Sequence, residues 1–81
     1  MNPKMKILRK KAMSLPLLPG VYIMKNADGK IIYIGKAKAL KNRVSQYFGS
    51  QNRHPVKVRK MVENVDRFDY IVTGSEFEAL V

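Results

Sequence analysis

Tyrosines and cations gather between residues 22 and 47 of this 81-residue chain. An arginine can hold two phosphate oxygens in a planar fork. A tyrosine can donate to a phosphate, or take a proton from water if a nearby cation or metal lowers its pKa from about 10. Such a cluster suits phosphate chemistry, but the alternative, tyrosines that only fill half-buried strand positions, is the simpler one by pattern alone. The members of the cluster are Tyr22, Tyr33, Lys36, Lys38, Lys41, Arg43 and Tyr47.

Several other kinds of site are excluded by the residues that the sequence lacks. There is no cysteine, and His54 is the only histidine, so neither disulfides nor thiolate or paired-histidine metal sites can form. Gly35-Lys36 lacks the upstream glycine and the following Ser or Thr of a phosphate-binding loop. The six acidic residues are few and scattered, which disfavours a carboxylate-rich metal site. We expect His54 to be a surface residue or a phosphate contact.

The charge of the chain is strongly positive, with a formal net value of +10. A polyanion is the natural partner for this excess, and nucleic acid is the first candidate. An anionic membrane surface is the second, and a merely well-solvated basic protein is the third. No apolar run approaches the roughly 18 residues of a membrane span, and no signal peptide is evident. We therefore expect a cytoplasmic protein.

The hydrophobic pattern predicts one small domain in which helices and strands alternate. Basic residues surround a helix over 4–13, within the basic segment 1–14. A hairpin follows, with strands over 20–25 and 30–35 and a turn at 26–29. Its alternation places Tyr33 on the face shared by Ile31 and Gly35.

The second half of the chain predicts two helices and a third strand. Leu40, Val44 and Phe48 form the buried stripe of a helix over 39–48, with Arg43 and Tyr47 on its border. A helix follows from Pro55 to about Val65, and a strand over 67–73. If the 39–48 helix packs on the sheet, Tyr33, Lys36 and Arg43 converge. The second of these helices turns four residues inward: Val58, Met61, Val62 and Val65.

The last residues predict a further helix that is cut short. Ser75-Glu76-Phe77-Glu78 is a capping box, and an apolar end follows it at Val81. We therefore expect residues 1–81 to be one domain, truncated in its last helix and taken from a longer protein. The expected fold class is α+β, a small three-stranded, mainly antiparallel sheet flanked by helices.

Three motifs in order and at matching spacing make the sequence resemble a known family. They are Pro19-Gly20-Val21-Tyr22, Tyr33-Ile34-Gly35-Lys36-Ala37-Lys38, and Asn42-Arg43-Val44 with Tyr47-Phe48. This string resembles the GIY-YIG nucleases, and within them the UvrC branch, the incision subunits of bacterial nucleotide-excision repair. The resemblance extends from about Leu15 to the end of the chain.

The resemblance implies a metal-dependent DNA endonuclease and a role for each matching residue. Tyr33 would be the general base or would orient the attacking water, and Arg43 would stabilise charge on the scissile phosphate. Gly35 would allow close backbone approach, while Tyr22, Lys36 and Tyr47 would line the site and hold water or phosphate. We expect weaker contacts to the DNA backbone from Lys38, Lys41, Arg53 and Lys57.

The resemblance also implies one divalent cation, Mg²⁺ or Mn²⁺, acting as a Lewis acid on the leaving oxygen. In the family a glutamate on the helix after the third strand holds this ion, and by alignment that glutamate falls beyond Val81. Glu76 and Glu78 precede it and do not match it. We therefore expect no metal ligand in this chain, and little or no cleavage by the fragment alone.

The implied partners are damaged double-stranded DNA, cut on the 3′ side of the lesion, the UvrB subunit and other UvrC domains, with no membrane. Two rival functions stay open. One is a non-catalytic nucleic-acid-binding module, in which the tyrosines stack on bases or only pack. The other is a stand-alone structure-specific GIY-YIG endonuclease, which the Gly-Lys-Ala-Lys run disfavours.

Overall fold

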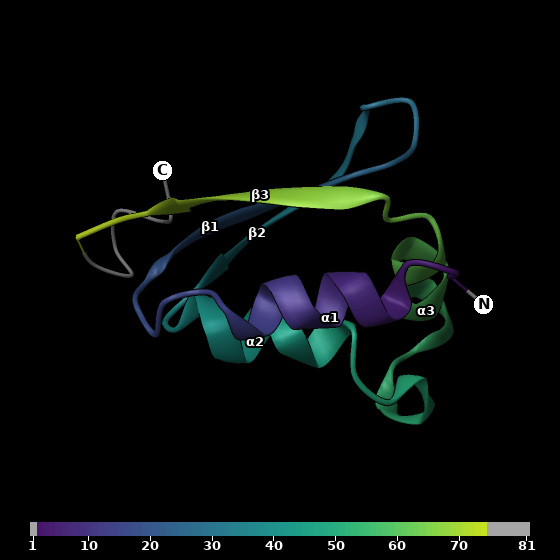
Figure 1. The fold of residues 1–81 in the computed structure, drawn as a ribbon, viewed down its shortest axis with the longest axis horizontal. Coiled ribbons are helices and arrows are strands. Elements are labelled where there is room, and N and C mark those ends of the chain that lie inside the picture. The colour runs from purple at the N-terminus through teal and green to yellow at the C-terminus, as the bar shows by residue number, and fades with distance from the viewer. Residues whose placement is uncertain (1, 75–81) are drawn as a thin grey trace.

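The computed structural model describes residues 2–74 and shows an α+β domain, as predicted (Figure 1). The predicted capping box at Ser75 and the helix after it lie outside the described residues. The elements, in chain order, are helix α1 (Met5–Met13), strands β1 (Gly20–Lys25) and β2 (Ile31–Ala37), helix α2 (Leu40–Tyr47), the 3-10 helix η1 (Gln51–Arg53), helix α3 (Val56–Glu63) and strand β3 (Arg67–Val72).

The three strands form one antiparallel sheet in the order β2-β1-β3, which confirms the predicted sheet. Helices α1 and α2 lie side by side along one face of it (Figure 1). On the central strand, alternation buries Gly20, Tyr22 and Met24 toward these helices. The predicted turn also forms, since Gly29 has a φ of 81° and donates to the carbonyl of Asn26 at 2.9 Å.

A register shift in the hairpin overturns part of the predicted alternation. Met24 pairs with Tyr33, but Lys25 pairs with Ile31, so the ladder skips Ile32. Such a bulge inserts one residue and changes which side chains face the core. As a result Ile32 packs against the core while Ile31 is exposed, and the prediction that Tyr33 shares a face with Ile31 was wrong.

The core lies between the sheet and the helices, and α2 supplies its centre. Leu40, Val44 and Phe48 are buried, as their spacing predicted. The Phe48 ring stacks on Phe68 of β3, with ring centroids 5.8 Å apart. Helix α3 ends at Glu63, earlier than predicted, because the side chain of Asn64 donates back to the Lys60 carbonyl at 2.8 Å and closes the last turn. Its predicted inward residues do pack on or within the core: Val58, Met61, Val62 and Val65.

Asn2 joins the start of the chain to its far end, a role that the sequence did not reveal. Its buried side-chain amide donates to the carbonyls of Val62 and Val65, both at 2.8 Å. Close by, Lys4 forms an ion pair with Asp66. Because a buried amide is tolerated only when it is hydrogen-bonded, Asn2 fixes where α1 begins relative to the link between α3 and β3.

Replacing Phe68 by alanine is expected to destabilise the domain by about 3–5 kcal/mol, because it removes a buried ring and leaves a cavity against Phe48. Urea unfolding followed by circular dichroism measures this loss. Ile71→Ala on the same strand is the matched control, because Ile71 is 58% exposed, and it should change stability by about 0.5 kcal/mol or less. Equal losses would contradict this account of the core.

Candidate active site

The ring of Tyr22 lies directly across Gly35. These two residues are partners in the β1–β2 ladder. A Cβ on residue 35 would clash with Cζ and Oη of Tyr22, so only glycine leaves space for the ring. Glycine is needed at position 20 for a similar reason. A Cβ there would clash with the carbonyl oxygen of Ile71 and would lie 2.7 Å from Cδ1 of Leu40. The two glycines of the paired tripeptides thus serve close packing within the domain.

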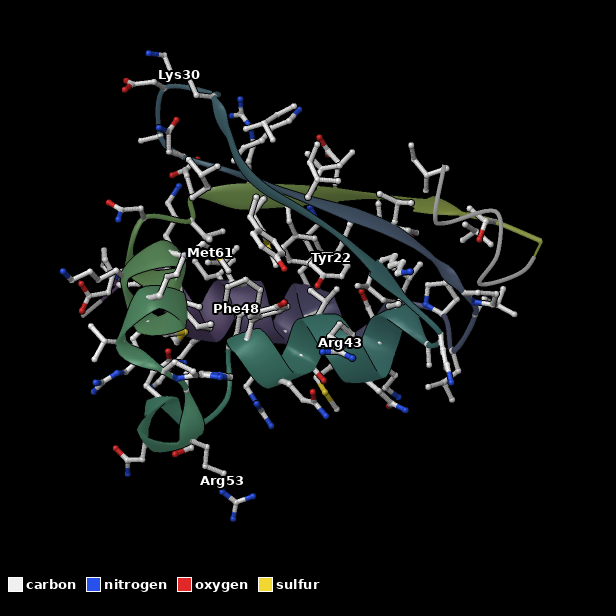
Figure 2. The ribbon with its side chains drawn as sticks, turned by 180° about the vertical axis from the view of Figure 1, so that it is seen from behind. Tyr22, Lys30, Arg43, Phe48, Arg53 and Met61 are labelled. Carbon is white, nitrogen blue, oxygen red and sulfur yellow. The ribbon has the colours of Figure 1, made fainter. Side chains whose placement is uncertain are left out.

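Three tyrosines from three elements meet beside this contact. The ring of Tyr22 on β1 lies 6.1 Å from that of Tyr33 on β2 and 5.6 Å from that of Tyr47 on α2. Tyr33 and Tyr47 meet edge to face at 6.2 Å. The hydroxyls of Tyr22 and Tyr47 are hydrogen-bonded at 2.8 Å. Figure 2 shows Tyr22 between the sheet and α2, close to the helix that carries Arg43.

Burial keeps two of these phenols protonated. It raises the pKa of Tyr22 above its ordinary value, and the hydrogen bond with Tyr47 adds to the effect. Burial likewise raises the pKa of Tyr47. The Arg43 charge opposes both shifts, which places it close enough to act on both hydroxyls. Tyr22 and Tyr47 therefore act as neutral hydrogen-bonding groups, whereas Tyr33, 42% exposed, presents its side chain to solvent.

Arg43 lies between the lysine-rich end of β2 and the tyrosines. A cavity of about 310 Å³ on one side of it is shared with Lys36 and Lys38. A second cavity, of about 210 Å³, is shared with Tyr47 and His54. The structure thus brings Arg43 to Lys36, as predicted, and to Tyr47.

The cavity that Tyr33 lines is a different one from those of Arg43. Tyr33 lines a cavity of about 340 Å³ with Tyr47 and Lys57, rather than the cavity of Lys36. The predicted convergence of Tyr33, Lys36 and Arg43 is therefore indirect, because Tyr47 stands between Tyr33 and the cations. The ring of Tyr47 forms one wall of the cavities on both sides.

His54 joins the cluster from the loop after α2, and sequence reasoning did not place it there. Its ring stacks on Tyr47, with centroids 6.1 Å apart and planes 24° from parallel. Its Nε2 is 2.9 Å from the carbonyl oxygen of Gln46. This contact could not be predicted from the sequence. It forms because the chain turns through η1 and brings His54 back onto α2.

The four weaker candidate contacts fall in different places. Lys38 lines the cavity of Arg43, and Lys57 lines that of Tyr33. Arg53 lines a separate cavity next to His54. Lys41 lines none of these cavities. It lies in the first turn of α2, where its backbone amide donates to the carbonyl of Pro16 at 3.2 Å.

The described residues do not by themselves suit a divalent cation. Hard cations take carboxylate and carbonyl oxygens. Within residues 2–74, no three or more His, Asp or Glu side chains lie close enough together to hold a metal. The polar atoms of the tyrosine cluster are neutral phenols and cations, which suit an anion rather than a metal ion.

Tyr22 and Tyr47 are expected to ionise only above the ordinary tyrosine pKa of about 10. Because their folded-state pKa values are raised, they stabilise the domain below pH 10, and this contribution is lost as the pH rises beyond that point. Tyrosinate absorbance during an alkaline titration measures the shift. Subtracting the curve of Tyr22→Phe from that of the parent should leave a component with a midpoint above 10, and a difference centred at or below 10 would contradict the assignment.

Gly35→Ala is expected to cost about 1–3 kcal/mol or more, because overpacking forces the Tyr22 ring away from β2. Gly49→Ala is the matched control, since its Cβ would come too close only to the far end of the long Arg9 side chain, at 2.9 Å, and would meet the Gln46 and Ser45 carbonyl oxygens at ordinary contact distances of 3.5 and 3.7 Å. Thermal unfolding compares the two variants. A melting temperature lowered equally in both, or in neither, would argue against the packing role of Gly35.

The chain is similar to known proteins in both sequence and fold. A family model described as the UvrC-like GIY-YIG domain matches residues 18–81. UvrABC system protein C of Clostridium perfringens strain SM101 is 63% identical over 67 residues, which is 83% of this chain and 11% of that protein. The Clostridium acetobutylicum protein of the same name is 60% identical over 68 residues, 84% of this chain and again 11% of the relative.

A solved structure agrees over nearly the whole chain. It is the GIY-YIG N-terminal endonuclease domain of UvrC from Thermotoga maritima, bound to magnesium as its catalytic divalent cation. The match has a TM-score of 0.79 and 44% identity, and it covers 99% of this chain and 82% of that one. This chain belongs to the UvrC-like GIY-YIG domain family.

Proposed function

We propose that the chain is the N-terminal endonuclease domain of a UvrC-type incision protein and hydrolyses a phosphodiester of damaged double-stranded DNA, on the 3′ side of the lesion. One observation carries the proposal. Tyr47 lines both the cavity of Tyr33 and that of Arg43, so that a solvent-exposed phenol and a guanidinium lie on either side of its ring, in neighbouring cavities open to a phosphate. The family membership supports the same reaction.

Tyr33 is proposed to act on the attacking water. It is the most exposed of the three clustered tyrosines, so water and substrate can reach its hydroxyl. Tyr22 and Tyr47 are hydrogen-bonded to one another and keep their protons. Their part is to hold the ring of Tyr33 and to fix water by hydrogen bonds. A positioned acid–base group of this kind typically contributes about 10²–10⁴ in rate.

Arg43 is proposed to stabilise the charge that develops on the scissile phosphate. Its side chain is exposed on α2 and can present a fork of donors to two phosphate oxygens. Lys36 adds a positive charge from the end of β2, across the same cavity. Gly35 gives these groups their placement, because it admits the Tyr22 ring that supports Tyr47.

The cofactor is proposed to be a single Mg²⁺ or Mn²⁺. The Thermotoga maritima UvrC structures are described as bound to a catalytic divalent cation. Within residues 2–74 no three or more acidic or histidine side chains gather to hold a metal, so we propose that the carboxylate ligand of that ion lies outside them. The roles of Tyr33 and Arg43 on water and phosphate do not depend on where those ligands lie.

The proposed partners are damaged DNA, UvrB and the other domains of the UvrC protein. The chain spans about 11% of the length of the curated relatives that it matches, so much of a UvrC protein lies outside the compared region. The charge of +10 favours a polyanionic substrate. None of the described helices is both long and apolar enough to cross a membrane. A cytoplasmic location is proposed, as befits a protein that acts on bacterial DNA.

Tyr33→Phe and Arg43→Ala are each expected to slow nicking of lesion-containing DNA by about 10²-fold or more. Both changes remove a group that contacts water or the phosphate in the reaction. Single-turnover nicking by the full-length protein with Mg²⁺ and UvrB measures the effect. Tyr70→Phe is the matched control, because Tyr70 is an exposed tyrosine on β3 outside the cluster, and it should stay within about twofold of the parent.

DNA affinity measured on the same variants separates a nuclease from a binding module. In a nuclease, Arg43→Ala lowers turnover far more than binding. If the domain only bound nucleic acid, the loss of binding would account for the whole loss of nicking, and Tyr33→Phe would nick normally. That pattern would overturn the proposed activity.

A further inference from the structure

A separate basic cavity opens behind the tyrosine cluster, where α1, the end of α2 and the η1 loop meet. Its volume is about 590 Å³. Figure 2 shows Arg53 at the tip of the η1 loop, away from the sheet. The polar side chains that line the cavity are Arg9, Ser45, Gln46, Ser50, Arg53 and His54.

The cavity is lined to receive an anion. Two arginines line it, and no acidic side chain is among its lining residues. Within residues 2–74, neither Arg9 nor Arg53 forms an ion pair. Arg9 makes one long hydrogen bond, from Nη1 to the Ser45 carbonyl at 3.5 Å. A guanidinium has five N–H donors, so most of the donors of both arginines remain available to a ligand.

The simplest structural role of Arg9 and His54 is to neutralise the end of α2, where carbonyls are left without helical partners. His54 does this well, with Nε2 at 2.9 Å from the Gln46 carbonyl. Arg9 does it poorly, at 3.5 Å, and Arg53 makes no such contact among the described residues. Capping of α2 explains the position of His54, but it does not explain why Arg9 and Arg53 line the same cavity.

The cavity continues the proposed active site. Gln46 and His54 line both this cavity and the one beside Arg43 and Tyr47. Arg43 and Gln46 in turn line the cavity of Lys36. A row of cationic side chains therefore follows α2 from Lys36 past Arg43 to Arg9 and Arg53.

The length of this row suits two phosphates of one strand. At about 1.5 Å per residue, the path from Arg43 along α2 and through the turn that closes it at Gly49, beside the cavity, is about 9 Å. Phosphates of one strand recur about every 3.4 Å along a duplex axis, so with α2 laid along that axis the path covers about three nucleotides. A strand with its scissile phosphate at Arg43 would bring a phosphate about three nucleotides away to the cavity.

We propose that Arg9 and Arg53 form a second phosphate subsite, which holds the cleaved strand about three nucleotides from the scissile bond. The proposal rests on the proposed action on DNA and extends it to residues of α1 and the η1 loop. Arg9 and Arg53 share one phosphate through their forked donors, with Ser50 at the rim of the cavity. The subsite sets how the strand lies along α2 and takes no part in bond cleavage.

Binding of the full-length protein to a lesion-containing duplex in EDTA tests the subsite without cleavage. The double variant Arg9→Gln with Arg53→Gln should lose about tenfold or more in affinity. Its log–log salt slope should fall by about 0.9, the value for one phosphate. Arg59→Gln with Lys30→Gln is the matched control, since it removes the same charge from exposed positions outside the cavities, and it should keep the parent slope.

A single neutral methylphosphonate, moved along the strand, locates the phosphate. The parent should lose affinity when the phosphate about three nucleotides from the nick is neutral, and the double variant should lose nothing further there. Equal losses in the double variant and its control would overturn the subsite in favour of general charge. Unchanged DNA binding in the double variant would also overturn it.

Two further readouts separate this proposal from the proposed activity. Thermal unfolding shows whether the double variant is folded, and Arg9→Lys with Arg53→Lys keeps the charge but lacks the fork, so it should recover only part of the affinity. If the parent binds with the expected dependence on the subsite but never nicks the duplex, the activity fails and the subsite stands. If the parent nicks but the cavity variants bind normally, the reverse holds.

Discussion

The close approach of the Tyr22 ring to Gly35 is the contact on which the rest of the site depends. With any side chain at position 35, the ring would meet it and would have to leave its place between the sheet and α2. In that place the Tyr22 hydroxyl reaches Tyr47 at 2.8 Å and ties the hairpin to the helix. Arg43, one turn earlier on α2, is positioned by the same tie. The absence of a side chain at Gly35 on β2 therefore helps to position the Arg43 guanidinium on α2.

Helix α2 meets three different demands on its three sides. Its buried side holds Leu40, Val44 and Phe48 in the core. Its border presents Tyr47 to the other tyrosines, where burial keeps the phenol protonated. Its exposed side carries Arg43 beside water, where a charge need not be desolvated. The helix can separate buried phenols from exposed cations within a few ångströms because its turns place neighbouring residues on different faces.

Much of the fold could be predicted because its signals are local. The hydrophobic stripe of α2 and the strand β1 both follow from local residue patterns, and the structure confirms them. The face of Ile31 could not be predicted, because a bulge shifts the ladder and leaves no mark in the alternation. Nor could the role of Asn2 be predicted from the sequence, since its partners, the Val62 and Val65 carbonyls, lie 60 and 63 residues away along the chain.

The sequence by itself determined the family and the residue types of the site, because Gly20, Tyr22, Tyr33 and Gly35 stand in motifs whose order and spacing are specific. Its charge of +10 also predicts a polyanionic partner. Only the tertiary structure decided how these groups meet. It places Tyr47 between Tyr33 and the cations, brings His54 back onto the Tyr47 ring, and places Arg9 of α1 and Arg53 at one cavity. These arrangements arise from the packing of α1, α2 and the η1 loop against one core, and so they leave no periodic pattern in the sequence.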